Sequence, residues 1–346
     1  MLEITGITVT QSPAGVILGD GGEVHLNGSQ TINGGTLRTA NGGTVNRSGN
    51  GNTTMSDVFI DCDVSLVAPS GLIYGSDTLA CTGTVAINDA SSVNNSFVQF
   101  NANTTLSGGG RLFLGGSGND SQVITSASTF TIAPDFTVEG SGDIAASLIN
   151  NGLVRAFPSA NGDGRLRLYS LSKTNNSQMV ADTGGVLEIT GMTITQNAEG
   201  GDDGELLADG GIVEFNGSQT VNGGVMRTAN GGRLVKIGNG NLTASDLTLE
   251  GDLELQAPSG FLYGGLSFVN NGVVRINTTG SANNGYMQFN ADTVITGDGR
   301  FALEGGGDDS QLITSASTAT FGPDQRVEGE GKMFGSYVLE GVLAPG

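Results

Sequence analysis

Hydrophobic residues along this chain stand in ones and twos, separated by Gly, Asn, Ser, Thr and Asp, and long apolar runs are missing. Between these turn residues, short segments alternate polar and apolar positions, which is typical of short β-strands. Examples are Thr36-Leu37-Arg38, Thr44-Val45-Asn46, Val64-Ser65-Leu66 and Leu72-Ile73-Tyr74. Helix-forming runs of Ala, Leu, Glu and Lys are absent. The pattern therefore predicts an all-β protein.

The apolar segments also recur at a fixed distance. A step of 21 residues separates three pairs of apolar residues: Val64 and Val85, Leu79 and Phe100, Leu253 and Val274. Stacked coils of this length bury in continuous columns the apolar residues that one coil cannot bury alone. The sequence thus predicts a right-handed parallel β-helix, a single-stranded β-solenoid of about 21 residues per coil, with roughly three short strands per coil and about sixteen coils.

A longer repeat contains the short one. Leu2-Glu3-Ile4-Thr5-Gly6 recurs at 187–191, and Asn27-Gly28-Ser29-Gln30-Thr31 recurs at 216–220. The offset changes from 185 to 189, which indicates a four-residue insertion near Asp202-Asp203. We therefore expect one continuous solenoid over residues 1–346, built from two near-tandem copies, 1–185 and 186–346. Both ends fall in mid-pattern, so we expect a fragment of a longer chain whose export signal lies outside it.

The charge of the chain limits its partners. It has 34 acidic and 14 basic residues, a formal net charge of −20. Such a surface repels phosphate backbones, so nucleic acid is not an expected partner. No segment is apolar for long enough to span a membrane, and no membrane insertion is expected.

Enzymes built on this scaffold that act on polysaccharides need clustered carboxylates with an Arg, Lys or His on one face. His25 is replaced by Glu214 in the second copy. Arg111 and Arg300 match between the copies, but each stands beside a strand, where we expect its head in solvent. No catalytic residue and no cofactor are therefore predicted.

Calcium is the one metal that the sequence suggests. Residues 115–122 nearly match the calcium-binding nonapeptide GGxGxDxUx, but Gln122 stands where an apolar residue belongs. The candidate ligands are five aspartates: Asp120, Asp202, Asp203, Asp308 and Asp309. Glycine-rich and solvated turns explain the same residues, and this interpretation is preferred.

Two further features leave alternatives open. Cys62 and Cys81 lie 19 residues apart, close to one coil, so they could be vertical neighbours, bridged or as two packed thiols. Thr8-Val9-Thr10 and Thr193-Ile194-Thr195 suggest a threonine ladder that binds ice, but such pairs do not recur every 21 residues. Ice binding is therefore not expected.

The chain resembles the secreted β-helix passenger regions of bacterial autotransporters and filamentous-haemagglutinin-like surface proteins. The resemblance rests on four phrases, at 33–37, 150–154, 183–189 and 341–346, the last being Gly341-Val342-Leu343-Ala344-Pro345-Gly346. It implies secretion, a stalk on a bacterial surface and contact with surface glycans or proteins.

The leading hypothesis is a non-catalytic structural or adhesive stalk. The alternatives are a polysaccharide-binding or polysaccharide-degrading β-helix enzyme and a fibre subunit that stacks end to end with other copies of itself, since solenoid ends expose unpaired strand edges.

Overall fold

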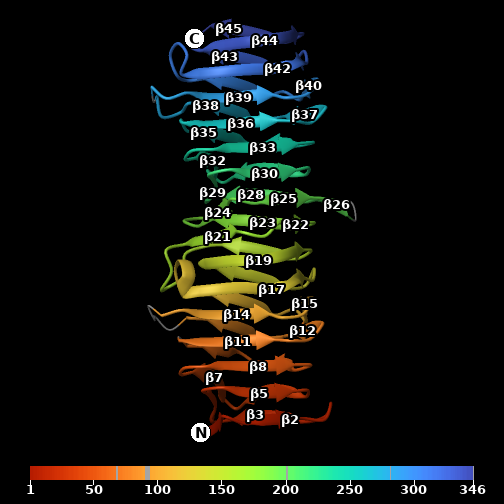
Figure 1. The fold of residues 1–346 in the computed structure, drawn as a ribbon, viewed down its shortest axis with the longest axis vertical. Coiled ribbons are helices and arrows are strands. Elements are labelled where there is room, and N and C mark those ends of the chain that lie inside the picture. The colour runs from red at the N-terminus through yellow and green to blue at the C-terminus, as the bar shows by residue number, and fades with distance from the viewer. Residues whose placement is uncertain (68, 90–93, 200–201, 281, 346) are drawn as a thin grey trace. The chain divides into compact units, whose positions relative to one another are not determined.

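The computed structural model describes residues 1–67, 69–89, 94–199, 202–280 and 282–345. The chain divides into two compact units, Met1–Leu171 and Ser172–Gly346. Within each unit, strands of successive coils lie in parallel layers, one above the other (Figure 1). Each unit is a parallel β-solenoid, which confirms the predicted fold class.

Unit 1 contains three parallel sheets, and each coil contributes about one strand to each sheet. Sheet 1 contains β1 (Leu2–Thr5), β4 (Glu23–Asn27), β7 (Thr44–Ser48), β10 (Val64–Leu66), β13 (Thr84–Ile87), β16 (Arg111–Leu114), β18 (Thr137–Gly140) and β20 (Leu153–Ala156). Sheet 2 contains β2 (Thr8–Thr10), β5 (Gln30–Asn33), β8 (Asn52–Ser56), β11 (Ser70–Tyr74), β14 (Ser96–Phe100), the first parts of β17 (Ser121–Ile132) and β19 (Gly142–Asn150), and β21 (Arg165–Tyr169). Sheet 3 contains β3 (Val16–Asp20), β6 (Thr36–Ala40), β9 (Phe59–Asp61), β12 (Thr78–Ala80), β15 (Thr104–Ser107) and the second parts of β17 and β19. The short 3₁₀ helix η1 (Gly118–Asp120) precedes β17.

Unit 2 also has three sheets, numbered by their equivalence to those of unit 1. Sheet 1 contains β24 (Val186–Thr190), β29 (Ile212–Asn216), β32 (Arg233–Ile237), β35 (Asp252–Leu255), β38 (Val273–Ile276), β41 (Arg300–Leu303), β43 (Arg326–Gly329) and β45 (Val342–Pro345). Sheet 2 contains β22 (Lys173–Asn175), β25 (Thr193–Gln196), β30 (Gln219–Asn222), β33 (Asn241–Ser245), β36 (Ser259–Tyr263), β39 (Gly285–Phe289) and the first parts of β42 (Ser310–Phe321) and β44 (Lys332–Leu339). Sheet 3 contains β23 (Gln178–Asp182), β28 (Glu205–Asp209), β31 (Val225–Ala229), β34 (Thr248–Glu250), β37 (Ser267–Asn270), β40 (Thr293–Thr296) and the second parts of β42 and β44.

The length of a coil varies, and from Val24 and Val213 onward it varies identically in the two units. In unit 1 the sheet 1 register passes through Val24, Val45, Val64, Val85, Leu112, Val138 and Val154. In unit 2 it passes through Val213, Leu234, Leu253, Val274, Phe301, Val327 and Leu343, and each interval along the chain equals its counterpart in unit 1. The longest interval ends at Leu112 or Phe301, and the shortest ends at Val154 or Leu343. The duplication therefore copied a whole series of coils with their individual turns.

The predicted spacing is correct only for some coils. Val64 does pair with Val85, but Leu79 pairs with Leu106, and Phe100 pairs with Tyr74. The described chain makes about 14 turns of roughly 23 residues, fewer and longer than expected, because several turns between strands are extended.

The predicted insertion is a small hairpin. β26 (Ala198–Glu199) and β27 (Asp202–Asp203) pair antiparallel directly after β25. The interval from Leu187 to its register partner Val213 is therefore longer than the matching interval in unit 1, from Leu2 to Val24.

The core consists of columns of inward-facing residues. Val24, Val45, Val64 and Val85 stack in register and are all buried. The apolar residues of each strand thus continue one column through successive coils, which is the burial that a single coil cannot supply. The core of unit 1 also contains Phe100 and Phe130, from sheets 2 and 3, whose ring centroids lie 5.3 Å apart.

The asparagines of the Asn-Asn-Gly turns act mainly within their own turns. Asn150 and Asn270 are buried, and each side-chain oxygen accepts a hydrogen bond of 3.2 Å from the N–H two residues on. Asn270 also donates to the side chain of Gln325, at 3.1 Å. The bonds to Gly152 and Gly272 stabilise tight turns, and the Asn270–Gln325 bond links one such turn to a later turn of the chain.

Candidate functional site on the outer face of sheet 1

Arginine–carboxylate pairs join neighbouring coils on the outer face of sheet 1. Arg111 Nη1 lies 2.8 Å from Glu139 Oε1, and the corresponding Arg300 Nη1 lies 3.4 Å from Glu328 Oε1. Glu139 also lies 3.7 Å from Arg155, and its side chain is only 7% exposed. The guanidinium groups of Arg111 and Arg300 are partly exposed to solvent, as the sequence predicted, and each also pairs with a carboxylate.

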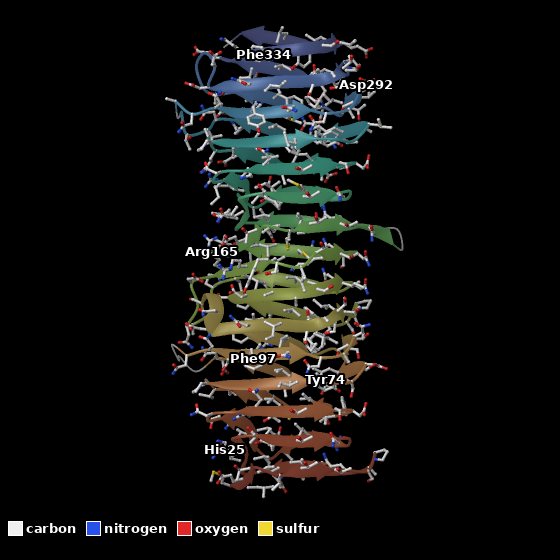
Figure 2. All side chains as sticks on the ribbon, in the orientation of Figure 1. His25, Tyr74, Phe97, Arg165, Asp292 and Phe334 are labelled. Atoms are coloured by element: carbon white, nitrogen blue, oxygen red, sulfur yellow. The ribbon has the colours of Figure 1, made fainter. Side chains whose placement is uncertain are left out.

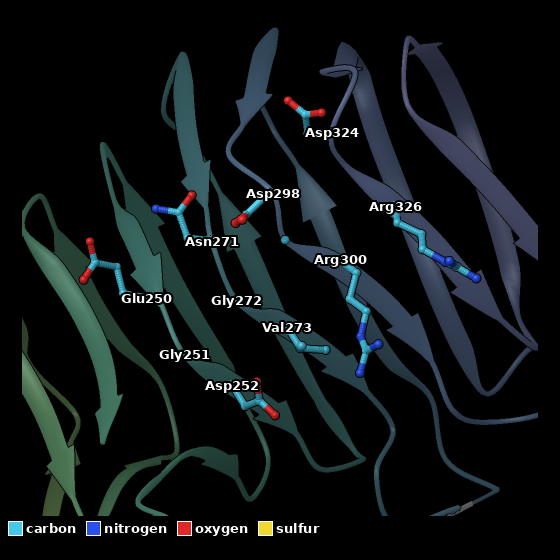
Figure 3. A pocket seen from close by; sticks show the side chains of 11 residues that line it. Glu250, Gly251, Asp252, Asn271, Gly272, Val273, Asp298, Arg300, Asp324 and Arg326 are labelled. Atoms are coloured by element: carbon cyan, nitrogen blue, oxygen red, sulfur yellow. The ribbon is translucent and has the colours of Figure 1, made fainter. Parts of the chain in front are cut away.

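A charged depression of unit 2 lies beside these pairs. It has a volume of about 530 Å³, and Figure 3 shows the side chains that line it. Its charged residues are Glu250, Asp252, Asp298, Asp324, Arg300 and Arg326. Asp298 and Asp324 lie in turns that lead from sheet 3 to sheet 1, and Asp252, Arg300 and Arg326 are the first residues of their sheet 1 strands. Successive coils therefore place these side chains in a row.

The positive and negative groups of this depression are separated. Arg300 and Arg326 both pair with Glu328, and Asp252 lies 3.2 Å from Arg275. In Figure 3 the guanidinium of Arg300 extends away from the carboxylate of Asp298. The arrangement is open and polar, and its arginines contact carboxylates of the chain itself.

The same turns in unit 1 use their carboxylates differently. Asp63 accepts a hydrogen bond from the N–H of Thr84 at 2.8 Å, and Asp135 accepts one from the N–H of Gly108 at 3.1 Å. These aspartates stabilise the turns by satisfying backbone donors. The charged row of unit 2 is therefore not repeated as a row in unit 1.

The calcium candidates stand in separate turns. Asp120 lies in η1, Asp308 is paired with Lys332, and the carbonyl of Asp309 accepts a hydrogen bond from Asn277. The side chains of Asp202 and Asp203 lie outside the described residues. Among the residues that the structure describes, no three His, Cys, Asp or Glu side chains are grouped so that they could hold a metal ion.

Cys62 and Cys81 are both buried and both free. Cys81 pairs across coils with Ile60 rather than with Cys62, and its Sγ lies 3.2 Å from the carbonyl of Gly83. Burial raises the pKa of Cys62 to about 12 and that of Cys81 to about 11. The thiols therefore stay protonated and poorly nucleophilic near neutral pH.

His25, labelled in Figure 2, lies on the outer face of β4, where its Nε2 lies 2.6 Å from the hydroxyl of Ser48. In unit 2 the equivalent position is occupied by Glu214 on β29. A histidine in one unit and a carboxylate in the other do not form a repeated catalytic group.

The sequence analysis missed a pair of buried cations. Arg47 and Lys236 occupy equivalent positions on β7 and β32, and both are fully buried. The alternation of Val45 with Arg47, and of Leu234 with Lys236, places both on the inner face of the strand. A basic residue at an inward position in both copies was the signal that could have identified them.

Comparison with known proteins identifies no relative of this chain. No family model matches the chain, no curated protein matches it, and no solved structure matches its fold. The class that the structure defines is a duplicated parallel β-solenoid. None of the described residues forms a helix that is long and apolar enough to cross a membrane.

Proposed function

We propose that this chain is a non-catalytic structural or adhesive β-solenoid stalk of an extracellular or cell-surface bacterial protein. One observation carries the proposal: polar side chains that recur in both units mostly join one coil to the next. Arg38 pairs with Asp61 in unit 1, as Arg227 pairs with Glu250 in unit 2. Asn41 likewise bonds to Asp20, and the pair recurs in unit 2.

These recurring contacts favour a scaffold because they stabilise the stacking of coils. An acid–base enzyme needs a donor and an acceptor that are free to reach a substrate. Here the duplicated arginines are held by carboxylates one coil away. The resemblance to secreted β-helix passengers supplies the extracellular location and the bacterial source as part of the proposal.

The charged depression of unit 2 favours a second candidate, an enzyme that degrades polysaccharides. Its carboxylates and arginines are the residue types that such an enzyme uses. One experiment separates the two candidates: incubation of the whole chain with acidic and neutral polysaccharides, followed by measurement of new reducing ends. We expect no more product than from heat-unfolded chain. Product that disappears in Asp298→Asn/Asp324→Asn would establish the enzyme and refute the stalk.

A fibre subunit is the third candidate. Leu2, Ile7 and Val16 are solvent-exposed on the first coil of unit 1, and Val342 and Leu343 are exposed on β45 of unit 2. Apolar strand edges that lack a neighbour favour association with other strands. Sedimentation velocity over a wide concentration range tests this candidate, which predicts species that grow with concentration.

A further inference from the structure

Each unit has a shallow groove on the outer face of sheet 2, and the two grooves are built from equivalent residues. The groove of unit 1 has a volume of about 400 Å³ and that of unit 2 about 350 Å³. The first is lined by Gly6, Ile7, Thr8, Ser29, Gln30, Thr31, Gly51, Asn52, Thr54 and Ile73. The second is lined by Gly191, Met192, Thr193, Ser218, Gln219, Thr220, Asn241, Thr243 and Leu262.

The lining of both grooves is uncharged. Hydroxyl and amide groups alternate there with a few apolar side chains, and no Asp, Glu, Lys or Arg is among the lining residues. The charged depression of unit 2, in contrast, is lined by six charged residues, and the chain has a net charge of −20. The chemistry of the grooves therefore fits a ligand that is neutral and rich in hydroxyl groups.

A threonine column forms the floor of each groove. Thr8 pairs in register with Thr31, and Thr31 pairs with Thr54. In unit 2 the same column contains Thr193, Thr220 and Thr243. Its members lie farther apart along the chain than the predicted coil length, so a search at the predicted period could not find the column. Stacking places a hydroxyl about every 4.8 Å along the groove.

An aromatic ring stands one coil beyond each groove. Phe97, labelled in Figure 2, lies on β14, and its ring rests above Gly71 of β11. Tyr286 occupies the equivalent place above Gly260, and its hydroxyl donates a hydrogen bond of 2.8 Å to the side-chain oxygen of Asn241. Both rings are half-buried, so each leaves apolar surface beside the polar groove.

We propose that these two grooves are binding sites for an uncharged polysaccharide. Sugar hydroxyls match the hydroxyl and amide groups of the floor, and an apolar sugar face matches the exposed part of Phe97 or Tyr286. An acidic glycan is repelled by the negative charge of the surrounding chain. The proposal rests on the adhesive form of the proposed function and names the chemistry of its partner.

The test is retention of the whole chain on insoluble cellulose, chitin and mannan, with soluble polygalacturonate as the acidic comparison. We expect at least one neutral polysaccharide to retain the chain and polygalacturonate not to bind it. In Thr31→Glu/Thr220→Glu the affinity should fall about tenfold or more, the size expected when hydrogen bonds to a neutral ligand are lost. Phe97→Ala/Tyr286→Ala, which removes the ring beside each groove, should weaken binding, whereas Tyr286→Phe, which makes the unit 2 groove like that of unit 1, should leave binding nearly unchanged.

The matched control is Thr44→Glu/Thr248→Glu, which adds the same charge at outward threonines of sheets 1 and 3. It should bind like the wild type. Equal loss in this control, or no retention of the wild type by any neutral polysaccharide, would overturn the proposal. Thermal hysteresis that is abolished by Thr31→Glu/Thr220→Glu, without polysaccharide retention, would assign the grooves to ice instead. A chain that neither binds nor cleaves glycans would overturn the groove proposal and leave the stalk intact.

Discussion

Arg47 and Lys236 occupy the same position in the two units, and each directs its buried cationic head at the carbonyl oxygens of the turn that follows its strand. Arg47 donates to the carbonyls of Ser48, Gly49 and Gly51, among others. Lys236 donates to the carbonyls of Ile237 and Gly238. Each cation therefore satisfies several carbonyl acceptors at the end of its strand and in the turn that follows.

The shared position predicts which substitutions the turn tolerates. Lys236→Arg should change the free energy of unfolding little, because the same turn in unit 1 already accommodates a guanidinium. Lys236→Met removes the donor and should lower the free energy of unfolding by about 1–3 kcal/mol. Urea denaturation of the whole chain measures both variants. A Met variant as stable as the wild type would show that the carbonyls need no cation.

Lys236 also predicts a pH dependence of stability. Burial lowers its pKa from 10.5 to about 8. Between these two values the unfolded state binds more protons than the folded state, so the free energy of unfolding rises with pH. The contribution is smallest below pH 8, where both states are protonated, and it is complete above about pH 10.5, where both states are neutral.

The measurement is urea denaturation at several pH values between about 8 and 10, below the ordinary pKa of tyrosine. Burial lowers the pKa of Lys173 to about 7, so part of the rise belongs to that residue. The raised pKa values of Cys62 and Cys81 act in the opposite direction, because in this range the thiols ionise only in the unfolded state. The share of Lys236 is the difference between the wild type and Lys236→Met. Parallel curves for the two proteins would contradict the assignment.

Removing Glu139 should destabilise the chain less than removing the arginines that pair with it. Its carboxylate is nearly buried, whereas Arg111 is 53% exposed. Arg111→Ala/Arg155→Ala leaves a buried carboxylate without a partner and should cost about 3 kcal/mol, whereas Glu139→Gln should cost clearly less. Arg300→Ala serves as the control, because Glu328 is more exposed and still pairs with Arg326. Urea denaturation measures the midpoint of each variant. A midpoint for Arg111→Ala/Arg155→Ala that is higher than that for Glu139→Gln would contradict the prediction.

The sequence predicted the coil and the duplication because both depend on the inward residues of short strands, and alternation reveals these directly. Val64 and Val85 stack as expected, but Leu79 does not lie under Phe100. The step there depends on turn lengths, and turn residues show no hydrophobic period. The threonine columns of sheet 2 escaped detection for the same reason.

The candidate sites were less predictable than the fold. The charged depression of unit 2 gathers Asp298, Asp324 and Arg300 from three different turns or strands. Their proximity depends on the register between coils. That register is set by the lengths of the turns, which the hydrophobic pattern does not reveal. Arg47, in contrast, directly follows the predicted strand Thr44-Val45-Asn46, and continuing the alternation from Val45 would have placed it inward.

Gly71 predicts a packing conflict on the outer face of sheet 2. A Cβ at this position would overlap the ring of Phe97 and the side-chain oxygen of Asn52. Gly71→Ala should therefore lower the free energy of unfolding by about 1–3 kcal/mol. The same change in a Phe97→Ala background should cost less, because the ring is gone. A double-mutant cycle by urea denaturation measures this coupling, and additive effects would show that the ring does not determine the need for glycine.

The two cysteines predict chemical inertness in the folded chain. Burial raises the pKa of both thiols, to about 12 for Cys62 and about 11 for Cys81, so almost no thiolate exists at pH 8. Iodoacetamide should therefore leave the native chain unmodified for hours and alkylate both residues rapidly in concentrated urea. Mass spectrometry of the intact chain counts the added groups. Two alkylations in urea without reductant indicate free thiols, whereas none without reductant and two with it would reveal a disulfide. Fast alkylation of the native chain would instead show that this part of the core opens readily.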